Sequence, residues 1–456
     1  MSDITGGCYG ERSGCSQVRD GKKRLRSTLA DFGLLFCFFS LVTVYANWAW
    51  LTGDKSMSAY IPPFVEGYSM SGQSHMGGEY LNIAEAIFEG RGYSDPFGDE
   101  TGPTGWSPPV LTYSMAACLY LVDGSRDKLV ICFLSMQAFV LAFTATVLFY
   151  IVSSLRQTRL AVLAMAIVVI PNFKWMFQLT HDCVFQMFWI ALIVLGLWTW
   201  RVPPIQTWKK IAWGLLGGIC ALSSPIVGFA WASTTVATWR LTNWKAICLV
   251  ATTSVLIVTP WVLYQSNRLG KFTPIKSNAS FEQFQGQLVL PDGLVVEESY
   301  RLHPYGPKSV EGKRYREIGE TEYLSEKRQE FRAAVSKTPW EYARKSICRV
   351  LAATVWLESE IPSNSEKPSF MLLRLLAVLP FVGLIFVVFP RVESAGWALP
   401  AAFCFAFYLV PYVFVAYYER YAVPLTLPRT IFTFWLLYSV KDYLKGKRCV
   451  PSTNTE

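Results

Sequence analysis

The chain has 456 residues, of which 52% are hydrophobic and only 16% charged, and its 42 Lys and Arg exceed its 33 Asp and Glu for a net charge of +9. Many apolar residues form runs long enough to cross a bilayer, which takes about 20 residues per helix. The composition therefore excludes an ordinary soluble domain and predicts an all-α polytopic membrane protein. The basic residues gather at segment ends and do not interleave with aromatic residues, so they indicate membrane topology and argue against nucleic acid as a partner. The eleven cysteines include no CxxC pair, which argues against a zinc site or a disulfide framework.

The chain begins with a polar tail, residues 1–27, which contains the basic run KKRLR. Such a run favours the cytoplasmic side of a membrane, and the long polar stretch before any apolar run is not typical of a cleavable signal peptide. The first membrane span is predicted at about residues 30–51. Residues 52–127 should then form an outer loop.

This first outer loop contains the longest polar, turn-rich stretch in the first half of the chain, from His75 to Tyr113. Apolar residues at helical spacing predict a short helix from Glu79 to Glu89, and a carboxylate suits the free amides at its start. Glycines and prolines then predict a series of turns, among them the sequence GPTGW that ends at Trp106. Long structured loops of this kind are usually functional. A short apolar helix, residues 110–122, is predicted to lie along the membrane before the chain re-enters it.

The rest of the membrane core, which we assign to residues 28–265, is predicted to hold six further spans. Two short ones share the run 211–239 and are hinged at Ser223, Ser224 and Pro225. The other four lie at about residues 129–153, 160–177, 184–200 and 246–265.

A second polar region, residues 266–362, is predicted to lie outside the membrane and to be helical from Tyr315 to Lys345. The apolar segment 346–360 is too short to span, so we expect it to pack on the membrane surface. The C-terminal helices, residues 363–440, should contain the last three spans, and a basic cytoplasmic tail, residues 441–456, ends the chain. These spans lie at about residues 369–389, 396–416 and 422–440. Ten spans place both termini in the cytoplasm, with Lys or Arg in most inner turns.

The predicted topology brings five candidate functional side chains to the outer side of the membrane: Glu79, His181, Asp182, Lys276 and Arg420. A carboxylate at the membrane edge can accept a proton from an attacking hydroxyl. An arginine can stabilise a departing phosphate through charge-assisted hydrogen bonds. This combination suits transfer of a group from a lipid-phosphate donor.

Each candidate also has a purely structural interpretation. Glu79 and Asp182 stand where carboxylates commonly cap helix starts. His181 fits a solvated interfacial histidine, and Arg420 can snorkel to lipid headgroups. Arg429, deeper in the last predicted span, is either functional or one member of a structural pair.

Several stretches, in their order along the chain, resemble the polytopic glycosyltransferases of the GT-C fold. The resemblance is closer to the bacterial family 39-like branch, related to protein O-mannosyltransferases and aminoarabinose transferases. The matching stretches cover scattered parts of nearly the whole chain: GGEYLNIAEAIFEGRGYSDPF with TGPTGWSPPV, HDCVFQ, PWVLYQSNRLGKFTPIKSN, GETEYLSEKRQEFRAAVSKTPWEYARK and ERYAVPLTLP.

The resemblance implies a GT-C-like bundle of about ten transmembrane helices with a structured first outer loop and a small second outer region. It implies an inverting transfer of a hexosyl or pentosyl group from a polyprenyl-phosphate carrier to a glycan, lipid or protein acceptor. The location would be the outer, periplasmic face of a bacterial inner membrane.

The resemblance also implies residue roles. Glu79 and Asp182 match the family's loop acids and would be catalytic, and Asp182 is the candidate ligand for a divalent cation, Mg²⁺ or Mn²⁺. Arg420, with Lys276, would bind the donor phosphate. Tyr80, Trp106 and His181 would line the acceptor side of the loop. Many relatives carry an Asp-Glu pair in the first loop, whereas this chain has Gly77 and Gly78 before a single glutamate.

Two other classes of function remain open from the sequence. A transporter or lipid flippase would fit the Ser-Ser-Pro hinge, since broken helices mark transport sites. A membrane assembly subunit would use the outer loops to bind a protein partner. The concentration of polar residues in two outer regions favours the glycosyltransferase.

Overall fold

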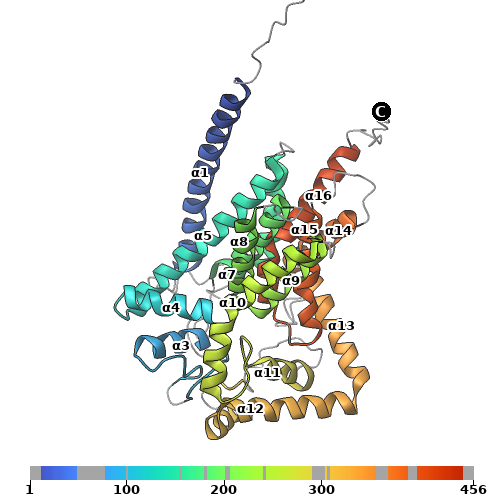
Figure 1. The fold of residues 1–456 in the computed structure, drawn as a ribbon. Coiled ribbons are helices and arrows are strands. Elements are labelled where there is room, and N and C mark those ends of the chain that lie inside the picture. The colour runs from blue at the N-terminus through green and yellow to red at the C-terminus, as the bar shows by residue number, and fades with distance from the viewer. Residues whose placement is uncertain are drawn as a thin grey trace, which may run out of the picture.

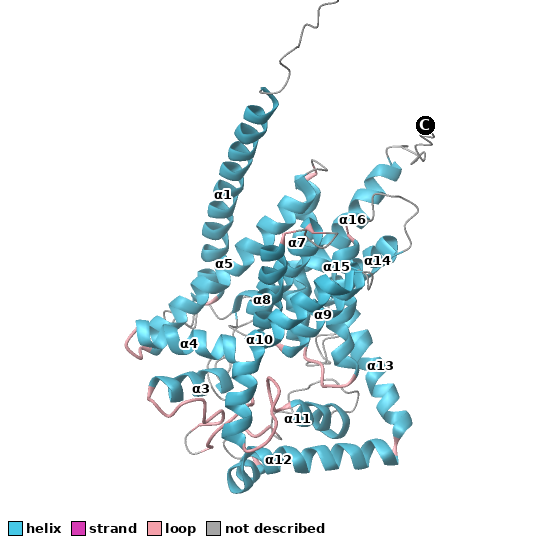
Figure 2. Cartoon of the chain, in the orientation of Figure 1, coloured by secondary structure: helices cyan, strands magenta, loops and turns pink. Residues whose placement is uncertain are grey.

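The computed structural model describes residues 12–48, 78–98, 101–153, 157–178, 182–200, 206–239, 243–289, 303–305, 309–355, 368–388 and 398–444. Over these residues the chain is helical and contains no β-strand (Figures 1 and 2). One isolated antiparallel bridge joins Ser94 to Pro103. The all-helical class predicted from the sequence is therefore confirmed.

The helices follow the predicted order, with boundaries set by the chain's own caps and prolines. The α-helices are α1 (Arg12–Ala46), α3 (Gly78–Phe88), α4 (Pro109–Leu121), α5 (Arg126–Val152), α6 (Thr158–Val169), α7 (Asp182–Thr199), α8 (Thr207–Ser223), α9 (Pro225–Trp239), α10 (Trp244–Leu269), α11 (Ala279–Phe284), α12 (Val310–Lys337), α13 (Pro339–Val355), α14 (Pro368–Val388), α15 (Leu399–Leu409) and α16 (Thr426–Leu444). Short 3₁₀ and π segments join several of them: η3 (Ile170–Asn172), η4 (Lys174–Gln178), η6 (Gln285–Val289), η10 (Val410–Val413) and η11 (Glu419–Leu425).

Five of the described helices are long and apolar enough to cross a membrane. They comprise Leu29–Ala46 of α1, Lys128–Val152 of α5, Asp182–Thr199, Trp244–Leu269 and Met371–Val388 of α14. Shorter apolar helices cover Pro109–Leu121, Thr158–Asn172 and Leu399–Val413. The membrane-embedded class is thus confirmed, while the count of ten spans stays a prediction.

The elements separate into a bundle and a loop-rich end (Figure 1). The first residues of α1 and the last of α16 extend to one end of the molecule, while α3, α11 and α12 lie at the opposite end. We call this opposite end, made of α3, α11, α12 and the turns between them, the loop end. The helix α12 runs across it, and α13 leads back to the bundle.

The start of α1 differs from the prediction. Residues 12–27 were expected to belong to a polar tail, but the helix already begins at Arg12. Its apolar half packs against α5, where the rings of Phe32 and Phe139 meet edge to face at 5.5 Å.

The predicted hinge in residues 211–239 is present. Ser224 is extended (φ −165°, ψ 125°) and separates α8 from α9, which begins at Pro225. The two helices pack closely because glycines face their partners: a Cβ on Gly217 would lie 2.4 Å from the Trp231 ring.

Two predicted spans are less regular than expected. The span predicted at 160–177 is α-helical only to Val169 and continues as 3₁₀ and π turns, because Pro171 lacks an amide for the α-helical ladder. The span predicted at 422–440 likewise begins as the 3₁₀ segment η11, which contains Pro424, before α16 starts.

The second polar region also differs. The helix expected from Tyr315 to Lys345 is divided at Thr338, and Pro339 starts α13. Residues 346–355, expected as a separate surface segment, are the second half of α13. Arg349 explains the position of α13. Its buried guanidinium donates to the backbone carbonyls of Gly286, Tyr412 and Val413 and so holds α13 against the bundle.

Candidate functional site

Glu79 lies at the loop end, where its carboxylate faces a histidine from the second polar region. It is the second residue of α3, as the sequence predicted, and its Oε1 is 3.7 Å from Nε2 of His303. Tyr305 packs so closely on Gly78 that a Cβ there would lie 2.6 Å from the tyrosine ring. The small residue before Glu79 therefore allows the two regions to meet.

His303 was not among the residues singled out from the sequence. Its Nδ1 accepts a hydrogen bond of 3.2 Å from the backbone amide of Tyr305, so in the neutral ring the proton sits on Nε2, which faces Glu79. Burial lowers the pKa of His303; the Glu79 carboxylate opposes this shift, and the nearby Arg420 charge adds to it. A neutral histidine that donates towards Glu79 is the form that this arrangement favours.

Asp182 is the first residue of α7 and is bonded to donors from two elements. Gln186 Nε2 donates to its Oδ2 at 2.6 Å, and the Tyr80 hydroxyl donates to the same oxygen at 3.4 Å. Burial raises the pKa of Tyr80 well above its usual value, and Asp182 raises it further, so the phenol keeps its proton. The structure thus brings Asp182 together with the residue that follows Glu79.

Arg420 lies in η11 among tyrosines. Its Cζ is 4.7 Å from the centre of the Tyr418 ring and 5.6 Å from that of Tyr421, within the range of cation–π attraction. Burial raises the pKa of Tyr421; Glu282 raises it further, Arg420 lowers it, and Asp182 contributes a smaller rise. Charges of both signs, from Glu282, Arg420 and Asp182, therefore act on the Tyr421 phenol.

Lys276, the other predicted phosphate-binding residue, forms an ion pair with Glu282. Its Nζ donates to Oε1 of Glu282 at 2.7 Å, and both side chains are largely buried. Glu282 was not predicted as part of the site, and it neutralises the lysine.

The other residues predicted from the sequence do not all belong to this cluster. Trp106 is only 3% exposed and packs edge to face against Phe97 and His303. It therefore supports the histidine that faces Glu79. His181 lies outside the described residues. Arg429 is buried and donates to the carbonyl of Ala353 near the C-terminal end of α13, where a cation suits the helix dipole.

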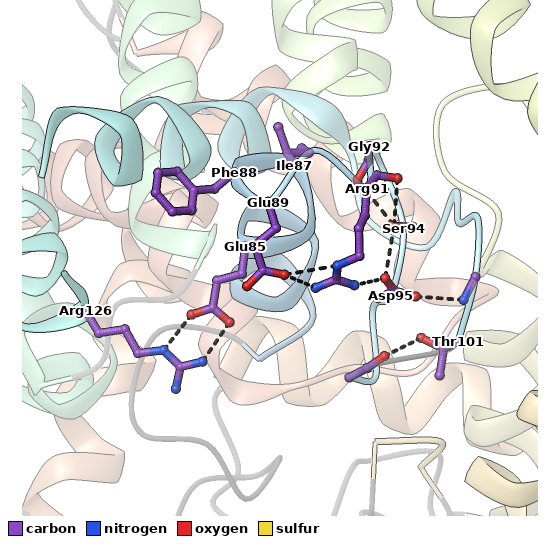
Figure 3. A network of polar contacts seen from close by, with 12 residues as sticks. Glu85, Ile87, Phe88, Glu89, Arg91, Gly92, Ser94, Asp95, Thr101 and Arg126 are labelled. Atoms are coloured by element: carbon purple, nitrogen blue, oxygen red, sulfur yellow. Dashed lines mark hydrogen bonds and ion pairs between the residues drawn. The ribbon is translucent and has the colours of Figure 1, made fainter. Parts of the chain in front are cut away.

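The first outer loop is held in shape by the buried carboxylate of Asp95. Asp95 is only 6% exposed, pairs with Arg91, and accepts a 2.9 Å hydrogen bond from the Gly102 amide (Figure 3). Figure 3 also shows Glu85 of α3 bound through both oxygens to Arg126 at the start of α5. These contacts fix the turns after α3 in one conformation.

A second buried carboxylate joins the two polar regions. Glu320 of α12 accepts hydrogen bonds from the Thr104 hydroxyl, the Gly105 amide at 2.8 Å and the Tyr315 hydroxyl at 2.8 Å. Burial raises the pKa of Glu320, while the hydrogen bonds from Thr104, Gly105 and Tyr315 oppose that shift. The hydrogen bonds to Thr104 and Gly105 therefore hold the GPTGW turn, residues 102–106, against α12.

An apolar cavity opens beside this cluster within the bundle. It has a volume of about 450 Å³ and lies between α1, α4, α5 and α7. Among the described residues that line it, Asp182 is the one charged side chain, beside Gln186 and a majority of apolar side chains. We call it the first cavity. It offers an apolar compartment with a carboxylate at the start of α7.

The predicted divalent cation finds no cage among the described residues, where no three His, Cys, Asp or Glu side chains come together. The Asp182 carboxylate instead accepts hydrogen bonds from Tyr80 and Gln186.

In comparisons with known proteins, no family model, no curated protein and no solved structure matched this chain.

Proposed function

We propose that the protein is a glycosyltransferase that moves a sugar from a polyprenyl-phosphate donor to an acceptor at the loop end. One observation carries the proposal. Asp182 lines an apolar cavity in the bundle, Tyr80 joins it to the helix start that holds Glu79, and Glu79 and Arg420 both act on His303. A lipid-linked sugar has the matching parts: a hydrocarbon chain, a phosphate and a ring of hydroxyl groups.

Each part of the donor has a candidate partner. The first cavity takes the beginning of the hydrocarbon chain, and Asp182 at its edge accepts hydrogen bonds from sugar hydroxyls. Arg420 pairs with the phosphate, which carries the developing negative charge as it leaves.

The chemical step needs a base, and Glu79 is the candidate. Its carboxylate takes the proton of the acceptor hydroxyl while that oxygen bonds to the anomeric carbon and the bond to the phosphate oxygen breaks. His303 lies beside this carboxylate, with its Nε2 at 3.7 Å from Oε1. Attack from the face opposite the phosphate inverts the anomeric centre, as the family resemblance implies.

We further propose ten spans with both termini in the cytoplasm of a bacterial cell and the loop end in the periplasm. The basic residues near the ends of the chain support this orientation. The opposite placement of the termini and of α12 in Figure 1 supports it as well.

A transporter or flippase is the second candidate. The helix break at Ser224 supports it, since the adjacent Ser223 lines the first cavity. Such a protein would move a lipid-linked molecule without breaking its glycosidic bond.

Binding and turnover of radiolabelled polyprenyl-phosphate sugars by the purified protein test the proposal. Glu79→Gln should keep binding but lower turnover by about 10² or more, because general-base catalysis is worth that much. Arg420→Ala should weaken binding. Glu85→Gln, the same change on the same helix in a residue that pairs with Arg126, is the matched control and should remain active.

The outcomes separate the hypotheses. Most of the turnover surviving in Glu79→Gln would remove that residue as the base. Binding without any bond cleavage in the wild type would favour the transporter, and no binding to any lipid-linked sugar by folded protein would reject the donor class.

A further inference from the structure

A buried row of hydrogen-bonded side chains leads from η10 to Asp182. The Tyr412 hydroxyl donates to the Tyr408 hydroxyl of α15 at 3.2 Å, and Tyr408 donates to Oε1 of Gln186 at 3.4 Å. Nε2 of Gln186 then donates to Oδ2 of Asp182 at 2.6 Å. Tyr412, Tyr408 and Gln186 are only 1%, 0% and 6% exposed, so the protein and not water supplies their partners. We call Tyr412, Tyr408 and Gln186 the relay.

Helical spacing builds two of the three links. Tyr408 and Tyr412 are four residues apart, and so are Asp182 and Gln186, which places the members of each pair on one face of their helical segment. The middle link crosses from α15 to α7, two helices that pack against each other. The relay therefore forms only because these two faces meet in the folded bundle.

The relay has one direction because it ends on a carboxylate. An ionised carboxylate only accepts hydrogen bonds, so the Gln186 amide turns its N–H towards Asp182 and its oxygen towards Tyr408. Tyr408 gives its proton to that oxygen and receives one from Tyr412. An amide suits this position because it accepts at one end and donates at the other.

The far end of the relay is fixed beside the arginine proposed to bind the phosphate. The Tyr412 ring lies 5.0 Å from the ring of Tyr421, and the Arg420 guanidinium lies 5.6 Å from that second ring. The Tyr412 carbonyl accepts a 3.0 Å hydrogen bond from Nε of Arg349. Contacts to both its ring and its backbone therefore hold the first member of the relay in place.

The relay leaves the two oxygens of Asp182 with different partners. Oδ2 accepts hydrogen bonds from both Gln186 and Tyr80. Oδ1 is approached by Sγ of Cys183 at 3.5 Å, and a thiol is a weak donor. Oδ1 therefore has free capacity to accept a hydrogen bond from a ligand beside the first cavity, which Asp182 lines.

We propose that Gln186 and Tyr408 are positioning residues that hold Asp182 with its Oδ1 presented to a hydroxyl of the donor sugar. This inference rests on the proposed function and names the part of the donor that the carboxylate recognises. A phosphate dianion has no proton to donate to Oδ1, so the relay favours a carrier that bears a sugar over the bare carrier. The bare polyprenyl phosphate is the product of the proposed transfer. The relay thus helps the site to release its product.

Binding of undecaprenyl phosphate with and without a sugar tests the relay in full-length protein in phosphatidylcholine nanodiscs. The sugar probes are glucosyl, mannosyl and arabinosyl undecaprenyl phosphate, and the wild type should bind at least one of them more tightly than the bare probe. Gln186→Leu should weaken that sugar probe by about tenfold, as expected for a lost hydrogen bond to a charged group, and leave the bare probe unchanged. Tyr408→Phe keeps the ring and should act in the same direction by less.

Gln137→Leu is the matched control. Gln137 is another fully buried glutamine of the bundle, and it donates through Nε2 to the carbonyl of Met176 and not to Asp182. Its substitution removes one buried hydrogen bond, as Gln186→Leu does. The preference for the sugar probe should survive in this variant.

Gln186→Glu adds a readout that a merely structural role would not move. Two carboxyl groups in hydrogen-bond contact cannot both ionise readily, so they share a proton at low pH that replaces the lost amide proton. The sugar preference should therefore approach that of the wild type at low pH and fall as the pH rises, whereas Gln186→Leu stays weak throughout. Tyr80, Tyr408 and Cys183 also face this pair, but phenols and thiols ordinarily titrate at about pH 8.5 or above. The nearby Arg420 guanidinium keeps its charge over this range.

The outcomes separate this inference from the proposed function. Equal losses for the bare and sugar probes in Gln186→Leu would show a structural role only and overturn the inference. An unchanged sugar preference in Tyr408→Phe, a pH-independent Gln186→Glu, or a wild type that binds all probes equally would overturn it as well. If Gln186→Leu does not fold, Tyr408→Phe and Gln186→Glu decide. Each of these results leaves the donor class intact, whereas folded wild type that binds no probe would reject the proposed function.

Discussion

At the scale of single residues, the contact between Glu79 and His303 distinguishes the candidate site from an ordinary helix start. A carboxylate at a helix start is common and can be merely structural. Here a histidine more than 200 residues away, fixed by the Tyr305 amide, directs its Nε2 at that carboxylate. The imidazole is kept neutral mainly by burial, so it contributes a hydrogen-bond donor and no charge.

The lowered pKa of His303 predicts a specific dependence of stability on pH. Below the unfolded-state value of about 6.5, the unfolded chain binds a proton that the folded ring resists, so the free energy of unfolding should fall as the pH drops through that value. The loss should level off below the folded-state pKa. His303→Asn keeps an acceptor for the Tyr305 amide and cannot titrate, so it should lose this component.

Thermal unfolding of both proteins in detergent across this pH range provides the measurement. Because other groups titrate too, the relevant quantity is the difference between wild type and variant. Parallel curves for the two proteins would contradict the assignment of a neutral, buried His303.

At the scale of elements, α12 owes its position to a buried carboxylate and an unusual glycine. Gly319 interrupts the helix with φ 77°, ψ 166°, a conformation that only glycine adopts readily, and Glu320 follows it. The break turns Glu320 towards Thr104 and Gly105 of the first outer loop. The two polar regions, distant in sequence, thereby become one platform over the bundle.

Glu320→Gln should loosen this platform. One carboxylate oxygen accepts from the Gly105 amide and the other from two hydroxyls, so an amide nitrogen in the second position would leave both hydroxyl protons without their acceptor. We expect a loss of about 1–3 kcal/mol of stability, the usual penalty for an unsatisfied buried polar group. Glu317→Gln, an exposed position on the same helix, should change stability little.

The rate of proteolysis within the loop around Thr104, measured with the melting temperature, distinguishes the two variants. Faster cleavage only in Glu320→Gln is the expected result. Equal behaviour of the two variants would show that the clamp contributes nothing.

At the scale of the whole molecule, the first turns of α1 and the last turns of α16 lie at one end, and α3, which holds Glu79, lies at the other (Figure 1). The proposed function needs these ends on opposite sides of a membrane, because the donor chain must lie between them. The five long apolar helices supply the hydrocarbon-facing surface for that arrangement.

Site-directed labelling can test the arrangement in intact cells. With exposed native cysteines replaced, Val310→Cys at the start of α12 should react with an impermeant maleimide added outside. Tyr443→Cys near the end of α16 should react only after the cells are permeabilised. Both side chains are well exposed, at 74% and 84%, so access to the thiol depends on the membrane. Labelling of both positions from the same side would refute the topology.

The sequence by itself determined the membrane class, most helix positions and the hinge at Ser224, because apolar periodicity and proline act over a few residues. It also placed Glu79 and Asp182 at helix starts. Only the tertiary structure brought His303 to Glu79, buried Asp95 and Glu320, paired Lys276 with Glu282 and opened an apolar cavity beside Asp182. Several of these contacts join residues far apart in the chain. Such contacts depend on how the helices pack against one another, which local patterns do not encode.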